Sequence, residues 1–127
     1  MKILHTSDWH VGKRIGRYDR SEEYRAVIAE VAAIAAAEDV DLVVHSGDLF
    51  DRPMPPIEAL NIGLGGLVAL SDHGRRPVVV IAGNHDSPGF FEALAPFLAE
   101  QNIHLIGTIK RPDEGGVLDL VTPGGRA

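Results

Sequence analysis

Three short segments of the chain contain residue types that bind metal ions and transfer protons. They are Asp8-x-His10, residues 47–51 with the sequence Gly-Asp-Leu-Phe-Asp, and residues 83–86 with the sequence Gly-Asn-His-Asp. Carboxylate, imidazole and amide groups bind divalent cations through oxygen and nitrogen. In an extended segment residues i and i+2 point to the same side, so Asp8 and His10 can bind one ion. These segments therefore predict a metal cluster.

Each segment also has a simpler interpretation. Asp8 and His10 could belong to a polar loop at the end of a strand, and residues 47–51 could form a turn with an Asp cap. Residues 83–86 could be an ordinary turn, because Asn and Asp favour such positions. All three segments directly follow apolar runs, in order along the chain, and this argues against chance.

The apolar runs before the segments predict three buried parallel strands. They cover residues 2–6, 41–45 and 77–82, and they are short and continuously apolar rather than alternating, as in strands buried on both faces. Ligands of open α/β sheets bind at the carboxyl ends of the strands. We therefore expect the polar segments to meet at one edge of one sheet.

Helices are predicted between these strands. The first begins at Ser21, which can cap it, and runs to about Glu38. Its apolar stripe consists of Tyr24, Val27, Ile28, Val31 and Ile34. The second follows Pro56 and contains three glycines, each costing about 1 kcal/mol against Ala in a helix interior, so close packing on the sheet should compensate. A third helix is expected at 88–98, strands at about 103–106 and 117–121, a turn or hairpin at 111–116, and a loop at 123–125.

Length and composition indicate one folded domain. The chain has 127 residues, 45% of them apolar, which fits one globular domain over residues 1–127. The alternation of predicted strands and helices indicates an α/β fold with a mostly parallel sheet and flanking helices. No cysteine is present, so disulfides, thiolate nucleophiles and cysteine-bound zinc are excluded. No apolar stretch is long enough for a signal peptide or a membrane span. We expect a cytoplasmic protein without a membrane partner.

The motifs resemble those of calcineurin-like metallophosphoesterases and, more narrowly, of the SbcD/Mre11 family of DNA repair nucleases. The resemblance rests on residues 6–12, Thr-Ser-Asp-Trp-His-Val-Gly, on 19–23, Asp-Arg-Ser-Glu-Glu, and on 81–88, Ile-Ala-Gly-Asn-His-Asp-Ser-Pro. Protein phosphatases of the superfamily continue their second motif as Asp-Arg-Gly, whereas Arg52 precedes Pro53 here. The resemblance implies an αββα sandwich, of which this chain is similar to the N-terminal half.

The resemblance also implies a role for each polar residue. Asp8 and His10 would hold the first of two metal ions, and Asn84 would hold the second. Asp48 would bridge the two ions. His85 resembles the catalytic imidazole of the family, and Asp51 would orient it by accepting a hydrogen bond from its second nitrogen. The mixed ligands suit Mn²⁺, which the family resemblance also favours.

The function implied is that of a Mn²⁺-dependent DNA exonuclease and endonuclease subunit acting in double-strand break repair. Two ions ~3.5–4 Å apart would activate a water that attacks the phosphodiester and would stabilise the departing oxygen. The partners implied are DNA and an ATPase of the SbcC/Rad50 type, the latter bound through segments absent from this chain. A phosphatase, a cyclic-nucleotide phosphodiesterase and a non-catalytic binding module that retains the fold remain as alternatives.

The sequence departs from the family pattern after His85. The family continues with a histidine on a later strand and a Gly-His-x-His motif, whereas this chain has only His104, which matches neither. We therefore expect one Mn²⁺ ion or partial occupancy, and no activity from this chain alone. An uncovered sheet face should also make the chain a homo-oligomer.

Other residues near the motifs have two interpretations each. The basic residues Lys13, Arg14, Arg17 and Arg20 could contact DNA phosphates or form a solvated loop. Trp9 and Tyr18 could stack on a base or pack against the protein. His5 and His45 fall inside predicted strands and are expected to be core or sheet-edge histidines. The net charge of −6 argues against a generally basic surface for nucleic acid.

Overall fold

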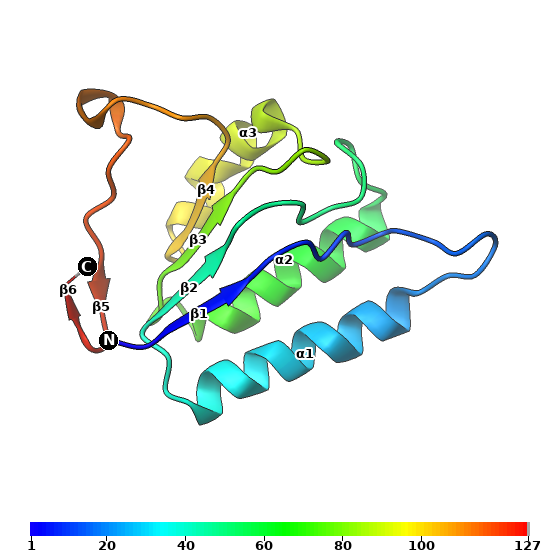
Figure 1. Cartoon of the computed structure of the whole chain (residues 1–127), viewed down its shortest axis with the longest axis horizontal. Helices are drawn as coiled ribbons and strands as arrows, with labels where there is room; N and C mark the ends of the chain where they lie inside the picture. The colour runs from blue at the N-terminus through cyan, green and yellow to red at the C-terminus, as the bar shows by residue number, and fades with distance from the viewer. Residues whose placement is uncertain (127) are drawn as a thin grey trace.

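One parallel sheet organises the protein (Figure 1). The computed structural model describes residues 1–126. The strands are β1 (Ile3–Thr6), β2 (Leu42–His45), β3 (Val78–Ile81) and β4 (Ile103–Ile106), in the order β1-β2-β3-β4. In register across the sheet, Leu4 pairs with Val43, Val43 with Val78, and Val78 with Ile103. The four strands confirm the α/β prediction, each within one residue of the expected ends.

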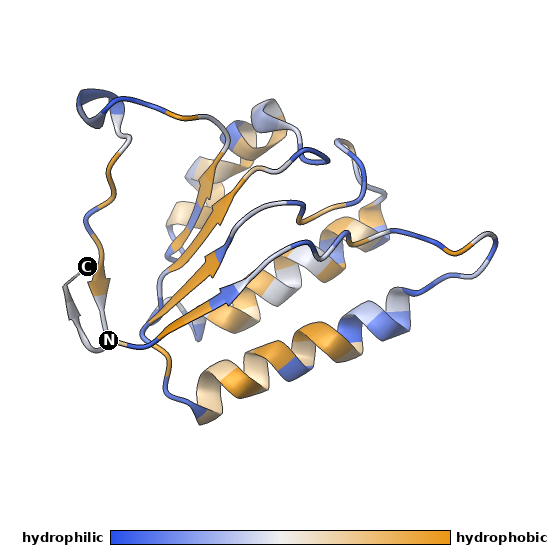
Figure 2. Cartoon of the chain, viewed as in Figure 1, coloured by the Kyte–Doolittle hydropathy of each residue, from blue (hydrophilic) through white to orange (hydrophobic). Residues whose placement is uncertain are grey.

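Three helices connect these strands and cover one face of the sheet. They are α1 (Ser21–Ala37), α2 (Ile57–Ser71) and α3 (Pro88–Ala99). Because the strand order follows the chain order, right-handed crossovers place every helix on the same side. The core lies between the helices and every second strand residue, including Val43, Val78, Val80, Ile103 and Leu105. Figure 2 shows apolar strands that end in more hydrophilic loops.

Glycines in α2 allow large side chains to approach the helix. A Cβ on Gly63 would overlap the ring of Phe50, and one on Gly66 would overlap Ile28 and approach Trp9. The expected close packing is therefore found at two of the three glycines, but against α1 and loop side chains. Gly65 has nothing within 4 Å of its Cβ position. No close contact of this kind therefore compensates for the free-energy cost of Gly65 in the helix.

The first turn of α1 differs from the sequence expectation. Ser21 is the first helical residue, and Asp19 accepts hydrogen bonds from the Ser21 N–H at 2.9 Å and the Ser21 hydroxyl at 2.7 Å. These hydrogen bonds hold the pKa of Asp19 below its usual value. The apolar stripe is also rotated, because Ala35 is buried whereas Val27 and Ile34 are exposed.

The opposite face of the sheet is only partly covered. Ile3 and Ile81 are exposed there, and residues 108–120 cross the face beside a cavity of about 420 Å³. The expected strand at 117–121 is wrong. A short hairpin of β5 (Val121–Thr122) and β6 (Gly125–Arg126) forms instead, because Pro123 and Gly124 favour a turn between them. The expected turn at 111–116 contains a 3₁₀ helix, η1 (Pro112–Glu114).

Within the described residues, no helix has both the length and the apolar character needed to cross a bilayer.

Candidate metal centre

The loops after β1 and β2 continue the parallel pairing of these strands beyond the sheet. The Asp8 N–H donates to the Gly47 carbonyl at 2.9 Å, and the His10 N–H donates to the Asp48 carbonyl at 2.9 Å. The Val11 N–H donates to the Leu49 carbonyl at 3.0 Å. The first two polar segments are thus fixed side by side, as their position after parallel strands predicts.

Three residues of these loops have left-handed backbones. The φ angles of Asp8, His10 and Asp48 are 55°, 49° and 54°. This region is uncommon for residues other than glycine and costs of order 1–3 kcal/mol at each site. Such conformations concentrate at functional sites, where surrounding structure holds them in place. Here they accompany the convergence of the Asp8, His10 and Asp48 side chains.

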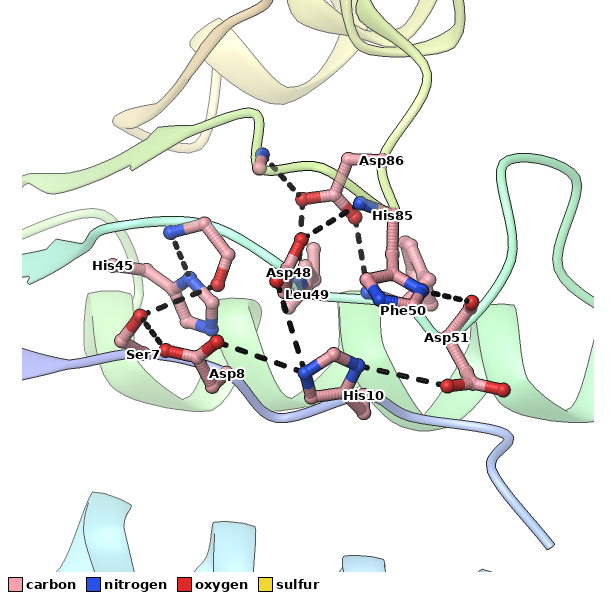
Figure 3. Close-up of polar contacts among 12 residues, drawn as sticks. Ser7, Asp8, His10, His45, Asp48, Leu49, Phe50, Asp51, His85 and Asp86 are labelled. Carbon is pink, nitrogen blue, oxygen red and sulfur yellow. Dashed lines mark hydrogen bonds and ion pairs between the residues drawn. The ribbon is translucent and has the colours of Figure 1, made fainter.

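The third polar segment is attached to the second by the Asp86 carboxylate (Figure 3). Asp86 is buried and accepts hydrogen bonds from the N–H groups of Leu49 and Phe50, both at 3.1 Å, and of Gly83 at 3.0 Å. Gly83 and Gly47 touch at this junction, where a side chain would not fit. The carboxyl ends of β1, β2 and β3 therefore meet at one site.

The spacing of Asp8, His10 and Asp48 fits a cation. The His10 Nε2 lies 3.6 Å from Asp8 Oδ1 and 3.8 Å from Asp48 Oδ2, beyond hydrogen-bond length. Ligands that each lie about 2.0–2.2 Å from one ion stand roughly 3–3.5 Å apart, so a small contraction would bring these three donors to one ion. Oxygen and imidazole nitrogen together suit a first-row divalent ion. The residues present therefore fit a divalent metal.

Each carboxylate of this group is oriented by a further hydrogen bond. The Ser7 hydroxyl donates to Asp8 Oδ2 at 2.6 Å and is the main reason that the pKa of Asp8 lies below its usual value. The His85 N–H donates to Asp48 Oδ1 at 2.8 Å. The second oxygen of Asp48 faces His10. Both carboxylates are thus ready to accept a cation.

His85 contacts Asp51 differently from the sequence expectation. Its Nδ1 lies 3.0 Å from the main-chain carbonyl of Asp51, which can only accept, so Nδ1 is the donor. The Asp51 carboxylate faces His10 instead, with Oδ1 at 3.6 Å from Nδ1. The expected carboxylate–His85 contact is therefore replaced by a main-chain contact. The rings of His10 and His85 meet edge to face, with centroids 4.8 Å apart.

The remaining expected residues lie around this cluster. Asn84 is exposed in the turn after β3, at the same end of the sheet. Of the basic residues, Arg14 donates to the Arg17 carbonyl and Arg20 pairs with Glu23. These contacts tie Arg14 and Arg20 to neighbouring residues of the loop and of α1.

Trp9 is packed into the protein. Its indole N–H donates to the Thr6 hydroxyl at 2.8 Å, and its ring meets His45 edge to face at 4.9 Å. Tyr18 is exposed in the loop that projects beyond α1 (Figure 1). Of the two aromatic residues considered from the sequence, Tyr18 is thus the one available to a ligand.

The comparisons with known proteins agree with this architecture. The profile of the family described as calcineurin-like phosphoesterase matches residues 1–125. The protein belongs to this family.

Among curated relatives, the chain is 47% identical over 107 residues to the SbcD subunit of the nuclease SbcCD of Bacillus subtilis, covering 84% of this chain and 27% of the relative. It is 38% identical over 122 residues to the SbcD subunit of Rhodobacter capsulatus, covering 94% and 30%. It is 39% identical over 122 residues to the DNA double-strand break repair protein Mre11 of Sulfurisphaera tokodaii, covering 95% and 31%. The chain thus spans about a third or less of these relatives.

Proposed function

We propose that this chain supplies part of the metal centre of a Mn²⁺-dependent nuclease that hydrolyses DNA phosphodiesters in double-strand break repair. The observation that carries the proposal is the convergence of Asp8, His10 and Asp48, all with left-handed backbones, at cation-binding distances. The similarity to proteins named as nuclease subunits and as repair proteins supports the substrate class.

The three clustered residues would hold one divalent ion, and Asn84 would contribute to a second ion in a complete site. A bound divalent ion lowers the pKa of water and polarises the phosphodiester. Asp48 has one oxygen toward His10 and the other engaged by the His85 N–H. This arrangement supports one tight site in the described residues. Mn²⁺ is proposed because the donors combine carboxylate and imidazole.

His85 is proposed as the general acid. Because its Nδ1 donates to the Asp51 carbonyl, Nε2 is left to carry the proton that passes to the leaving oxygen. The ring is exposed and packs edge to face on His10, beside the metal ligands. The main-chain contact fixes the tautomer and orientation of His85, a role that the sequence alone suggests for the Asp51 carboxylate.

DNA would approach along the loop between β1 and α1. This loop projects from the sheet edge next to the metal ligands (Figure 1) and exposes Lys13 and Arg17. Contacts from such side chains to phosphates position a duplex without reading its sequence, and they weaken as salt rises. An ATPase of the SbcC/Rad50 type is the proposed protein partner. A cytoplasmic location and self-association stay predictions.

A chimera tests this function directly. In it, the present chain replaces the matching segment of the Bacillus subtilis relative, and cleavage of linear duplex DNA is measured with and without Mn²⁺. We expect Mn²⁺-dependent cleavage, and we expect His85→Gln to lower the rate by about 10²–10⁴-fold while Mn²⁺ affinity is retained. His73→Asn is the matched control, because His73 is exposed and remote and its left-handed backbone suits Asn.

Three results would contradict parts of the proposal. Loss of metal affinity together with activity in His85→Gln would make His85 a ligand. Hydrolysis of phosphate monoesters or cyclic nucleotides in place of DNA would assign the chain to a phosphatase or a cyclic phosphodiesterase. Metal binding without hydrolysis of any phosphoester would indicate a non-catalytic binding module.

A further inference from the structure

His45 is the one buried imidazole for which the proposed mechanism has no role. It is the last residue of β2, with no solvent exposure, and burial lowers its pKa to about 4. Its ring therefore stays neutral at ordinary pH. Leu or Phe would fill the same space without burying a polar ring.

The Nδ1 of His45 has a specific contact. It accepts a hydrogen bond from the Gly47 N–H at 3.2 Å. A neutral imidazole that accepts at Nδ1 carries its proton on Nε2. Nε2 is buried and has no hydrogen-bond partner among residues 1–126. The ring is thus placed for its Nδ1 contact, although its other nitrogen is left unsatisfied.

The main-chain groups of Gly47 connect the two loops of the proposed metal centre. Its carbonyl accepts from the Asp8 N–H at 2.9 Å, and its N–H is held by His45. Gly47 has a φ of 121°, and Asp48 follows with a left-handed backbone. A shift of Gly47 would therefore move both Asp8, through the hydrogen bond to the Gly47 carbonyl, and Asp48, which follows it in the chain.

We propose that His45 is a positioning residue, which fixes the Gly47 peptide through Nδ1 and thereby sets the turn that presents Asp48. In this contact the side chain of residue i accepts from the main-chain N–H of residue i+2, the pattern that Asn makes in an Asx turn. The consequence for metal binding rests on the proposed metal centre. The consequence for the turn itself does not.

This geometry defines a set of matched variants. His45→Asn keeps an acceptor at the same distance from the backbone as Nδ1. His45→Leu removes the acceptor but keeps an apolar group of similar bulk. His45→Gln moves the amide one bond further out and serves as a second loss variant if the Leu variant does not fold. Urea unfolding of each variant establishes its global stability.

Two readouts are measured on this chain. Amide hydrogen exchange of Gly47 without metal reports on the turn, with Val79 in the centre of the sheet as the internal reference. Titration with Mn²⁺ reports on the ligands. We expect Leu and Gln to speed exchange at Gly47 at least ~10-fold relative to Val79 and to weaken Mn²⁺ binding by about 10–100-fold. We expect Asn to restore both values.

The inference would be overturned if amide exchange at Gly47 stayed as slow in His45→Leu and His45→Gln as in the unaltered chain. It would also be overturned if His45→Asn behaved like His45→Leu. If exchange at Gly47 and Val79 rises equally, His45 only stabilises the fold, and the inference is wrong. If the unaltered chain binds no Mn²⁺, the proposed metal centre fails, and the exchange comparison alone decides the role of His45. The two failures can therefore be told apart.

Discussion

The carboxylate of Asp51 faces His10, and only the main-chain carbonyl of Asp51 contacts His85. The carboxylate Oδ1 lies 3.6 Å from His10 Nδ1, and this nitrogen is buried without a hydrogen-bond partner among residues 1–126. Histidines that bind metals through one nitrogen commonly donate the other N–H to a carboxylate. Asp51 is therefore placed to orient His10, which we propose as a metal ligand.

The first prediction concerns this pair. Asp51→Asn should weaken Mn²⁺ binding about 10–100-fold, because His10 loses the carboxylate that orients its ring and raises its basicity. Isothermal titration with Mn²⁺ measures the change. Asp113→Asn, an exposed substitution in η1, is the control and should leave the affinity unchanged. Equal affinities for Asp51→Asn and the unaltered chain would mean that Asp51 acts only through its main chain.

The second prediction concerns the junction of β2 and β3. A Cβ on Gly83 would overlap the Asp48 carboxylate and its N–H. Gly83→Ala should therefore displace Asp48 and reduce Mn²⁺ affinity. Gly65→Ala is the matched control, because its Cβ position is empty and the change should stabilise α2 by about 1 kcal/mol. Calorimetric titration and urea unfolding of both variants separate the two effects. Wild-type affinity in Gly83→Ala would show that Asp48 can move without consequence.

The third prediction is a pH dependence of stability. Burial lowers the pKa of His45 in the folded protein from 6.5 to about 4. Between these values the unfolded chain binds a proton that the folded protein does not, so the free energy of unfolding falls as the pH decreases through this window. The loss is on the order of 3 kcal/mol and is complete near pH 4. Above pH 6.5 this group contributes no slope.

Urea unfolding between pH 4 and pH 7 checks this dependence. Other groups titrate in the same range, so the useful quantity is the difference between the unaltered chain and His45→Leu. That difference should favour the variant progressively as the pH falls. Parallel stability curves would show that His45 is protonated equally in both states.

The sheet could be predicted from the sequence because runs of β-branched residues define each strand. The meeting of the three polar segments also followed from the position of each segment after a parallel strand. Their roles in metal binding and catalysis, and the extent of the domain, stay predictions. The left-handed backbones of Asp8, His10 and Asp48 could not be predicted, because tertiary hydrogen bonds hold them against local preference.

Other differences have similarly local causes. Ser21 is not the cap of α1, because Arg20 occupies the N-cap position and the Asp19 carboxylate accepts locally from the Ser21 N–H. The contact between the Asp51 carboxylate and His10 could not be predicted, because the rotamer of a side chain depends on neighbours that are distant in the sequence. The apolar character of residues 117–121 predicts a strand there, but of these residues only Val121 pairs with a partner, as part of β5.

Titration of the purified chain with Mn²⁺ is the most direct test of a divalent metal site formed by Asp8, His10 and Asp48. We expect one tight site per chain, lost in Asp48→Ala and kept in the remote variant Asp113→Asn. Two tight sites would show that Asn84 and its neighbours can bind a second metal ion without further ligands. Absence of tight binding, or a site that survives Asp48→Ala, would contradict the proposed metal centre.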